Sequence, residues 1–214
     1  MVQTTVKKQR IPNSQRRENS VRQVLDAALD LFVTQGFDAT SMDDIASQAG
    51  LTKGALYFYF KDKLSLLDAL LLRTEGELID PIVASIQSKQ ASPTDRIVLL
   101  TSEFARMGAE RKELALLHVM VSLEMHGRDN KVEQRVRKMY ARLHDEIGNI
   151  LTDGQAAGEF SDIIAPHYQA SVIIALIDGL LLEWHRRGDD LDGEQLARSA
   201  RQLILNGVRA DNHS

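Results

Sequence analysis

The sequence contains no cysteine among its 214 residues. This absence excludes disulfide bonds, thiolate metal ligands and cysteine nucleophiles. The histidines do not suggest a metal site either. His118 and His126 are eight residues apart, and His144 lies on another predicted helix. None of these forms the pair spaced by four residues that binds a metal ion on one helix. We therefore expect no metal site and no cofactor.

Long hydrophobic runs are also missing. No apolar stretch reaches the roughly 18 residues that a membrane-spanning helix needs, and the first residues carry no apolar signal core. We expect a cytoplasmic protein with no membrane partner. The chain also lacks a glycine-rich phosphate loop, a nucleophile–base pairing and a paired-carboxylate motif, so we do not expect an enzyme.

Proline is scarce, with four in the chain, and no segment alternates polar and apolar residues as a strand would. The pattern predicts an all-α fold of about nine helices. Gly36 should end the first helix, and Pro81 should kink or restart the fourth, which is expected over 62–80. The remaining helices are predicted at about 93–108, 111–126, 130–154, 166–187 and 193–206.

The net charge is −4, but positive charge is concentrated near the N-terminus. Residues 1–25 contain six basic side chains and one acidic one, which suits a protein that meets phosphate with one end. Residues 1–18, which have little apolar content, are expected to form a flexible basic arm. Whether this arm touches DNA or is a solvated tail stays open. Residues 19–64 should form a DNA-binding domain and 65–214 a helical body.

Residues 37–63 predict two short helices joined by a tight turn at Gly50. Thr40 with Asp43 resembles a capping box at the start of the first, and Thr52 should open the second. The second helix ends in the aromatic run 57–60. Successive side chains on a helix turn by about 100°, so at least two of these four rings must be exposed. This geometry is typical of a helix that enters the major groove of DNA.

Residues 36–64 resemble the DNA-binding domain of the tetracycline-repressor (TetR) family. The positions at family spacing are Gly36, Thr40, Ile45-Ala46, Ala49-Gly50, Lys53-Gly54, Leu56-Tyr57, Phe60 and Lys63. One departure is Tyr59, where many relatives carry histidine. The resemblance implies a dimeric transcriptional regulator that binds double-stranded DNA at a palindromic operator.

The resemblance also implies individual DNA contacts. Thr40 and Ser41 would touch phosphate, and four positions would lie in the major groove: Thr52, Lys53, Gly54 and Ala55. Tyr57, Tyr59 and Lys63 would hold backbone phosphates. Phe58 is left open between packing on the first helix and reaching a thymine methyl group.

The helix expected at 166–187 is apolar almost all round, which predicts burial on two sides. One side would be the core of the protomer and the other a second subunit, with a single deeply buried helix in a monomer as the alternative. We expect a homodimer through this helix and the last one, in a four-helix interface. The predicted interface residues are Val172, Ala175, Leu176, Gly179, Leu180, Leu196, Ala200 and Leu203.

Polar and soft side chains embedded in the apolar helices are the candidates for a ligand pocket. They are Met107, Leu117, His118, Met120, Glu124, Tyr140, Asp178 and Trp184. Each methionine could equally fill a gap in the core. Glu124 could pair structurally with an arginine such as Arg142, and Asp178 could bond across a dimer.

These features predict a repressor that a small, partly apolar effector releases from its operator by shifting the fourth helix, 62–80. The alternative keeps the DNA binding without a small ligand, with an acidic body that binds a protein partner. A closed apolar pocket would favour the first function, and an exposed apolar patch the second.

Overall fold

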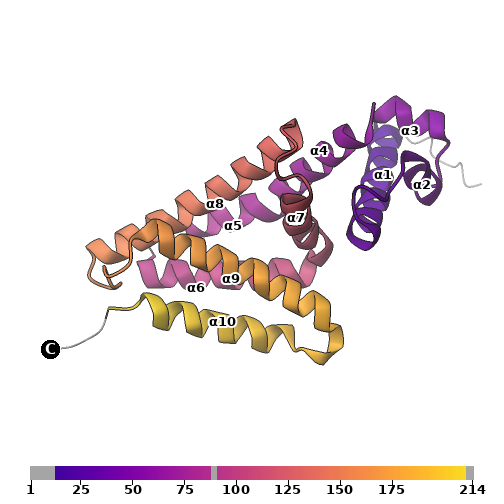
Figure 1. Ribbon diagram of the computed structural model, residues 1–214. Helices are drawn as coiled ribbons and strands as arrows, with labels where there is room; N and C mark the ends of the chain where they lie inside the picture. The colour runs from indigo at the N-terminus through magenta and orange to yellow at the C-terminus, as the bar shows by residue number, and fades with distance from the viewer. Residues whose placement is uncertain (1–12, 88–90, 211–214) are drawn as a thin grey trace, which may run out of the picture. The chain divides into compact units, whose positions relative to one another are not determined.

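The computed structural model describes residues 13–87 and 91–210. Its contacts divide the chain into two compact units, with the division after Leu66. Over these residues the chain forms nine continuous helical stretches and no strand, which confirms the predicted all-α class (Figure 1). Residues 1–12 of the predicted arm lie outside the described residues. Residues 13–18 of it are helical, so the arm expected over 1–18 is wrong for that part.

The first unit is built from α1 (Asn13–Gln35), α2 (Met42–Gln48) and α3 (Lys53–Tyr59). Gly36 ends α1 with a φ of 85°, and Gly50 turns the chain between α2 and α3 with a φ of 65°. Both values are in the left-handed region, where glycine pays no steric cost. The helices close on a small core that includes Phe32, Ile45 and Leu56.

The fourth helix changes its winding along its length. It runs as α4 (Lys63–Thr74), then as a π-helical turn η1 (Glu75–Ile79), then as α5 (Asp80–Ile86). The wide turn ends at Ile79, two residues before Pro81, which has no N–H and whose ring would collide with the carbonyl four residues earlier in a regular α-helix. The predicted kink or restart at Pro81 is therefore present as a π turn.

The second unit contains five further helices, whose ends agree with the predicted ranges within two residues. They are α6 (Pro93–Glu110), α7 (Lys112–Glu124), α8 (Lys131–Ala156), α9 (Pro166–Arg187) and α10 (Gly193–Val208). Helices α8 and α9 lie side by side, and α10 packs on both α6 and α9 (Figure 1).

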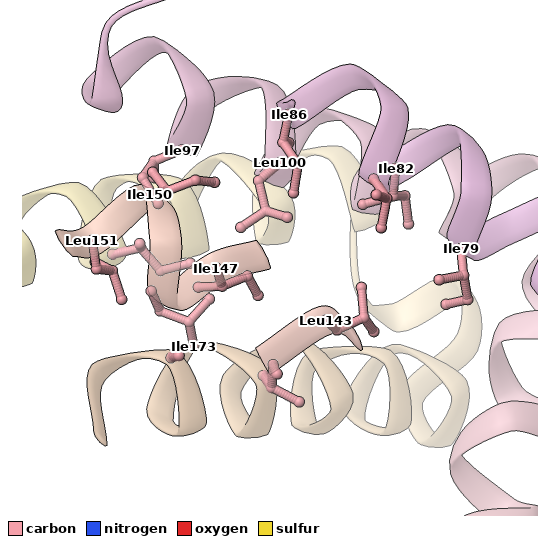
Figure 2. Packing of buried hydrophobic residues seen from close by; sticks show 14 of the residues in the cluster. Ile79, Ile82, Ile86, Ile97, Leu100, Leu143, Ile147, Ile150, Leu151 and Ile173 are labelled. Carbon is pink, nitrogen blue, oxygen red and sulfur yellow. The ribbon is translucent and has the colours of Figure 1, made fainter. Parts of the chain in front are cut away.

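Aliphatic side chains from α5, α6, α8 and α9 fill the core of this unit (Figure 2). Ile82, Leu100 and Ile147 are completely buried there. Burying a side chain of this size stabilises a fold by about 1.5–3 kcal/mol. This core holds the helices that surround the cavity described below.

Candidate DNA-binding surface and ligand cavity

Helix α3 presents the predicted groove-facing residues to solvent. The Thr52 side chain caps it by accepting a hydrogen bond from the Ala55 N–H at 3.2 Å. Leu56 and Phe60 are buried and anchor the helix, while Tyr57 and Phe58 are 44% and 77% exposed. Thr52, Lys53 and Gly54 are exposed as well, whereas Ala55 and Tyr59 are half-buried.

Phe58 therefore belongs to the exposed side, and its ring packs edge-on against Tyr59 at 5.3 Å. The aromatic run had shown only that two rings must be exposed. Because Leu56 and Phe60 are buried on the inner face of α3, Tyr57 and Phe58 are the two side chains of the run that are most exposed to solvent.

Lys53 forms an ion pair with Asp43 on α2 at 2.9 Å, and both side chains are more than 60% exposed (63% and 61%). The hydrogen bond from Lys53 to Asp43 raises the lysine pKa. An ion pair this exposed contributes little to stability, because water screens it. Lys53 can therefore exchange its carboxylate partner for a phosphate at low cost.

The start of α2 differs from expectation by one residue. Ser41, not Thr40, caps the helix, and it forms the capping box with Asp44 rather than Asp43. Hydrogen bonds from Ser41 hold the pKa of Asp44 below its ordinary value. Thr40 is 1% exposed and donates its hydroxyl proton to the Gly36 carbonyl at 2.8 Å. The Thr40 side chain is therefore committed to the end of α1, and Ser41 is the exposed hydroxyl at this position.

Lys63, which is predicted to hold a phosphate, makes contacts within the first unit that the sequence did not predict. Its ammonium group donates to the carbonyls of Phe37 and Thr40 at 2.5 and 2.6 Å, and lies 4.3 Å from the centre of the Phe37 ring. In this structure Lys63 thus joins α4 to the turn between α1 and α2. A structural role at this turn accounts for its position without DNA.

The second unit contains a partly open cavity of about 530 Å³, a size typical of small-molecule sites. Helices α6, α9 and α10 supply most of its wall, with contributions from η1, α7 and α8. The wall is largely apolar and includes Ile79, Phe104, Leu143, Ile174, Ile177 and Leu181. This cavity is the feature expected of a small-molecule sensor, and the exposed apolar side chains of α9, described below, are the feature expected of a partner-binding surface.

Polar groups collect at one part of the wall. His118 lines the cavity and stacks on Tyr140 with ring centres 4.5 Å apart, and the Tyr140 hydroxyl donates to Asp178 at 2.9 Å. Burial raises the pKa of both Tyr140 and Asp178. Burial lowers the pKa of His118 to about 4, so its ring is neutral at pH 7.

The structure brings together some of the predicted ligand residues and separates others. Met107, His118, Asp178 and Trp184 line the cavity, and Tyr140 lies behind His118 and Asp178. Leu117, Met120 and Glu124 are not part of its wall. Helix α7 is apolar on most sides, so the sequence did not show which of its faces meets the cavity.

Arg201 is a polar wall residue that the sequence did not single out. It lies on α10, where it donates from Nε to the Thr101 hydroxyl at 3.0 Å and from Nη2 to the Ser102 hydroxyl at 2.9 Å. A lone arginine in an amphipathic helix looks like an ordinary surface cation. Only the packing of α10 on α6 reveals its position.

The predicted dimer residues separate into an outer and an inner set. Val172 and Leu203 are 67% and 65% exposed, and Ala175 and Gly179 are also exposed. Leu176 is half-buried and packs against the core of its own protomer. The inner set, Leu180, Leu196 and Ala200, lines the cavity, and Ala200 is only 6% exposed. Placing Ala200 on an outer face was therefore wrong, because α10 turns that residue toward α6.

The exposed part of α9 forms a continuous stripe. Tyr168, which the prediction did not include, is 64% exposed and precedes Val172, Ala175 and Gly179 at helical spacing. We call these four residues the α9 stripe. Apolar side chains this exposed, gathered on one helix face, mark an interaction surface.

Within the described residues, no helix has the length and hydropathy required to cross a membrane. The same part of the chain holds no group of three or more histidine, aspartate or glutamate side chains suited to a metal ion.

The helix-turn-helix of the first unit and the apolar cavity of the second are features expected of a DNA-binding transcriptional regulator. Residues 24–70 match the family described as "Bacterial regulatory proteins, tetR family", and residues 93–207 match "BetI-type transcriptional repressor, C-terminal". The chain belongs to the TetR family of transcriptional regulators, as the resemblance predicted.

Individual proteins with similar sequences or structures are also transcriptional regulators. The structure of the MbdR regulator from Azoarcus sp. CIB is 34% identical, with a TM-score of 0.81 and coverage of 89% of this chain and all of that one (100%). The fatty acid metabolism regulator protein of Bacillus subtilis (strain 168) is 23% identical over 87% of this chain and 94% of its own length. The structure of FadR from Bacillus subtilis, in complex with stearoyl-CoA, is 24% identical with a TM-score of 0.72, over 88% of this chain and 99% of that chain, and shows the shared fold.

Proposed function

We propose that this regulator is a dimeric repressor that binds a palindromic operator and is released by a small effector bound in the cavity of the second unit. The observation that carries the proposal is the largely apolar, partly open cavity of about 530 Å³. Burying an apolar ligand there supplies binding energy, and the few polar wall groups can set specificity. The stearoyl-CoA complex of FadR, a relative with the same fold, supports a body of this kind that accepts a small molecule.

On the DNA side, Lys53, Tyr57 and Phe58 are the exposed groups on α3 best suited to the major groove and its flanking phosphates. Lys53 would exchange Asp43 for a phosphate, and Phe58 would pack on a thymine methyl or sugar. Ser41 would contact phosphate at the start of α2. One such helix contacts few bases, so two must be held about one helical turn apart to recognise a palindrome.

The α9 stripe, with Leu203 on α10, is the proposed dimer surface. Gly179 lets a second helix approach closely, because it has no side chain and open space lies around it. Two copies of the stripe would bury each other around a two-fold axis.

The π turn links the cavity to the helix that begins at Lys63. Leu78 and Ile79 of this turn line the cavity, while Glu75 pairs with Arg135 at 3.2 Å and Glu77 with Arg73 at 2.8 Å. The π turn is continuous with α4, so a displacement of its residues is passed to that helix, and single π turns are frequent at functional sites. A ligand that moves Leu78 and Ile79 would thereby shift α4. A flexible linker inserted between Lys61 and Asp62 should stop release by a compound that releases the wild type, and full release would refute this coupling.

The experiment that tests the function is affinity selection of random DNA duplexes with purified protein, followed by sequencing. The expected result is a palindrome with half-sites about one turn apart. Enrichment of no sequence by the folded protein at low salt would overturn the proposal.

A matched pair of variants locates the contact surface. Phe58→Ala should weaken operator binding by roughly tenfold or more, since fully burying a phenylalanine side chain contributes about 1.5–3 kcal/mol. Leu123→Ala, at a residue 71% exposed on α7, should leave binding unchanged. Equal effects of the two substitutions would refute the role of Phe58.

A further inference from the structure

The cavity wall contains one arginine that pairs with no carboxylate among the residues that the structure describes. Three arginines line the cavity, and two of them pair with acidic neighbours: Arg106 with Glu103 at 2.6 Å, and Arg198 with Glu194. Arg201 has no carboxylate within 4.0 Å in residues 13–87 and 91–210, and its hydrogen-bond partners are two hydroxyl groups.

These hydroxyl groups fix the direction of the guanidinium without neutralising it. Thr101 donates its proton to the Ile97 carbonyl at 3.0 Å, and Ser102 donates to the Val98 carbonyl at 2.7 Å. Their oxygen lone pairs are therefore the atoms that accept from Arg201. A guanidinium has five N–H donors, and only two are used here. Both Nη1 donors and one Nη2 donor remain, and one N–H from each of these two nitrogens can meet the two oxygens of a planar anion.

The surroundings make an anion the favoured partner. A half-buried charge beside an apolar wall loses solvation, and a carboxylate would restore this energy through charge-assisted hydrogen bonds. Arginine suits a carboxylate because its planar fork matches the two oxygens. Most of the remaining cavity wall is apolar, so it favours an apolar part of a ligand.

We propose that the effector is an amphipathic carboxylate, whose anionic group binds Arg201 and whose alkyl or aryl part fills the apolar cavity. This inference rests on the proposed function of the cavity as the effector site. Asp178 is the competing wall group, since it could attract a cation. It already accepts the Tyr140 hydroxyl at 2.9 Å, and its burial favours the neutral acid, so its attraction for a cation is weakened.

The test is calorimetric titration of the full-length protein with three probes that share one chain length: octanoate, 1-octanol and octyltrimethylammonium. Octanoate should bind at least about tenfold more tightly than either other probe, as expected for a charge-assisted hydrogen bond in a desolvated site. Tightest binding of octyltrimethylammonium would overturn the proposal in favour of Asp178. Equal binding of octanoate and 1-octanol, or no binding of octanoate at millimolar concentration, would also overturn it.

Variants assign the effect to one residue. Arg201→Gln should lose about tenfold or more in octanoate affinity while its affinity for 1-octanol stays within about twofold, which also shows that the cavity is intact. Arg186→Gln, on α9 outside the cavity wall and paired with Glu183 at 3.0 Å, should keep its octanoate affinity within about twofold. Equal losses for octanoate and 1-octanol in Arg201→Gln would mean that Arg201 is structural, and would overturn the proposal.

Failure of the function and failure of this inference are distinguishable. A protein that selects a palindrome but prefers 1-octanol or the cation refutes only the ligand class. A protein that binds octanoate through Arg201 but selects no DNA sequence refutes only the operator function.

Discussion

At the scale of single residues, His118 combines burial with unsatisfied polarity. It is 4% exposed, and neither ring nitrogen has a hydrogen-bond partner within the residues that the structure describes. A buried polar group without a partner costs about 1–3 kcal/mol. The ring is kept neutral, because burial lowers its pKa to about 4 from an ordinary value of 6.5.

This shift makes stability depend on pH. Below pH 6.5 the unfolded chain takes up a proton at His118 that the folded chain does not, so the free energy of unfolding falls as the pH falls from 6.5 to 4. The loss over the whole window is about 3 kcal/mol. His118→Phe removes both the unsatisfied nitrogens and the proton uptake. We expect it to be more stable than the wild type by about 1 kcal/mol at pH 7, and by about 2–3 kcal/mol more at pH 4.5.

Urea unfolding at these two pH values, at equal protein concentration, measures both quantities. An advantage for His118→Phe that is the same at pH 7 and pH 4.5 would show that His118 does not carry this proton linkage. A large loss of stability at both values would show that its ring makes contacts that phenylalanine cannot reproduce.

At the scale of elements, the packing at the end of α8 requires glycine, which has no side chain, at position 154. A Cβ atom on Gly154 would lie 2.0 Å from the Phe160 ring, which is 2% exposed. The segment after α8 also holds the end of α10, because Ser161 donates to the Val208 carbonyl at 2.8 Å. Gly154→Ala should therefore destabilise the protein by about 1–3 kcal/mol through overpacking.

Gly148 provides the matched control on the same helix. Space around it is open, so Gly148→Ala should stabilise the protein by up to about 1 kcal/mol through helix propensity. Thermal unfolding of both variants checks the pair. If Gly154→Ala were as stable as Gly148→Ala, Phe160 would not be fixed against α8.

The elements themselves could largely be predicted from the sequence, and the site only in part. Pro93, Pro166 and Gly36 mark helix ends through local backbone chemistry, which sequence shows directly. The cavity wall depends instead on which face of each helix packs inward. Helix α7 is apolar nearly all round, so His118 and Glu124 looked equivalent, and only tertiary packing places His118 in the wall. The carbonyl partners of Lys63 were not foreseen for a related reason, since they lie more than 20 residues earlier in the chain.

At the scale of the whole molecule, the proposed function needs two copies of the chain. The α9 stripe leaves Tyr168 and Val172 more than 60% exposed (64% and 67%), and Leu203 on α10 is similarly exposed at 65%. Complete burial of a large apolar side chain would contribute about 1.5–3 kcal/mol of stabilisation, which the exposed residues do not provide in a single protomer. A second protomer related by two-fold symmetry would bury both copies of the stripe at once.

Val172→Arg combined with Leu203→Arg should therefore give monomers in light scattering coupled to gel filtration, because like charges would meet at the two-fold axis. Operator affinity should fall together with dimer content, because a monomer binds one half-site and loses the effective concentration that a dimer provides. Leu123→Arg, equally exposed at 71% but outside the stripe, should remain a dimer. A dimeric double variant would place the subunit interface elsewhere on the body. A monomeric variant with full operator affinity would break the link between dimerisation and palindrome recognition, since each half-site would then be bound independently.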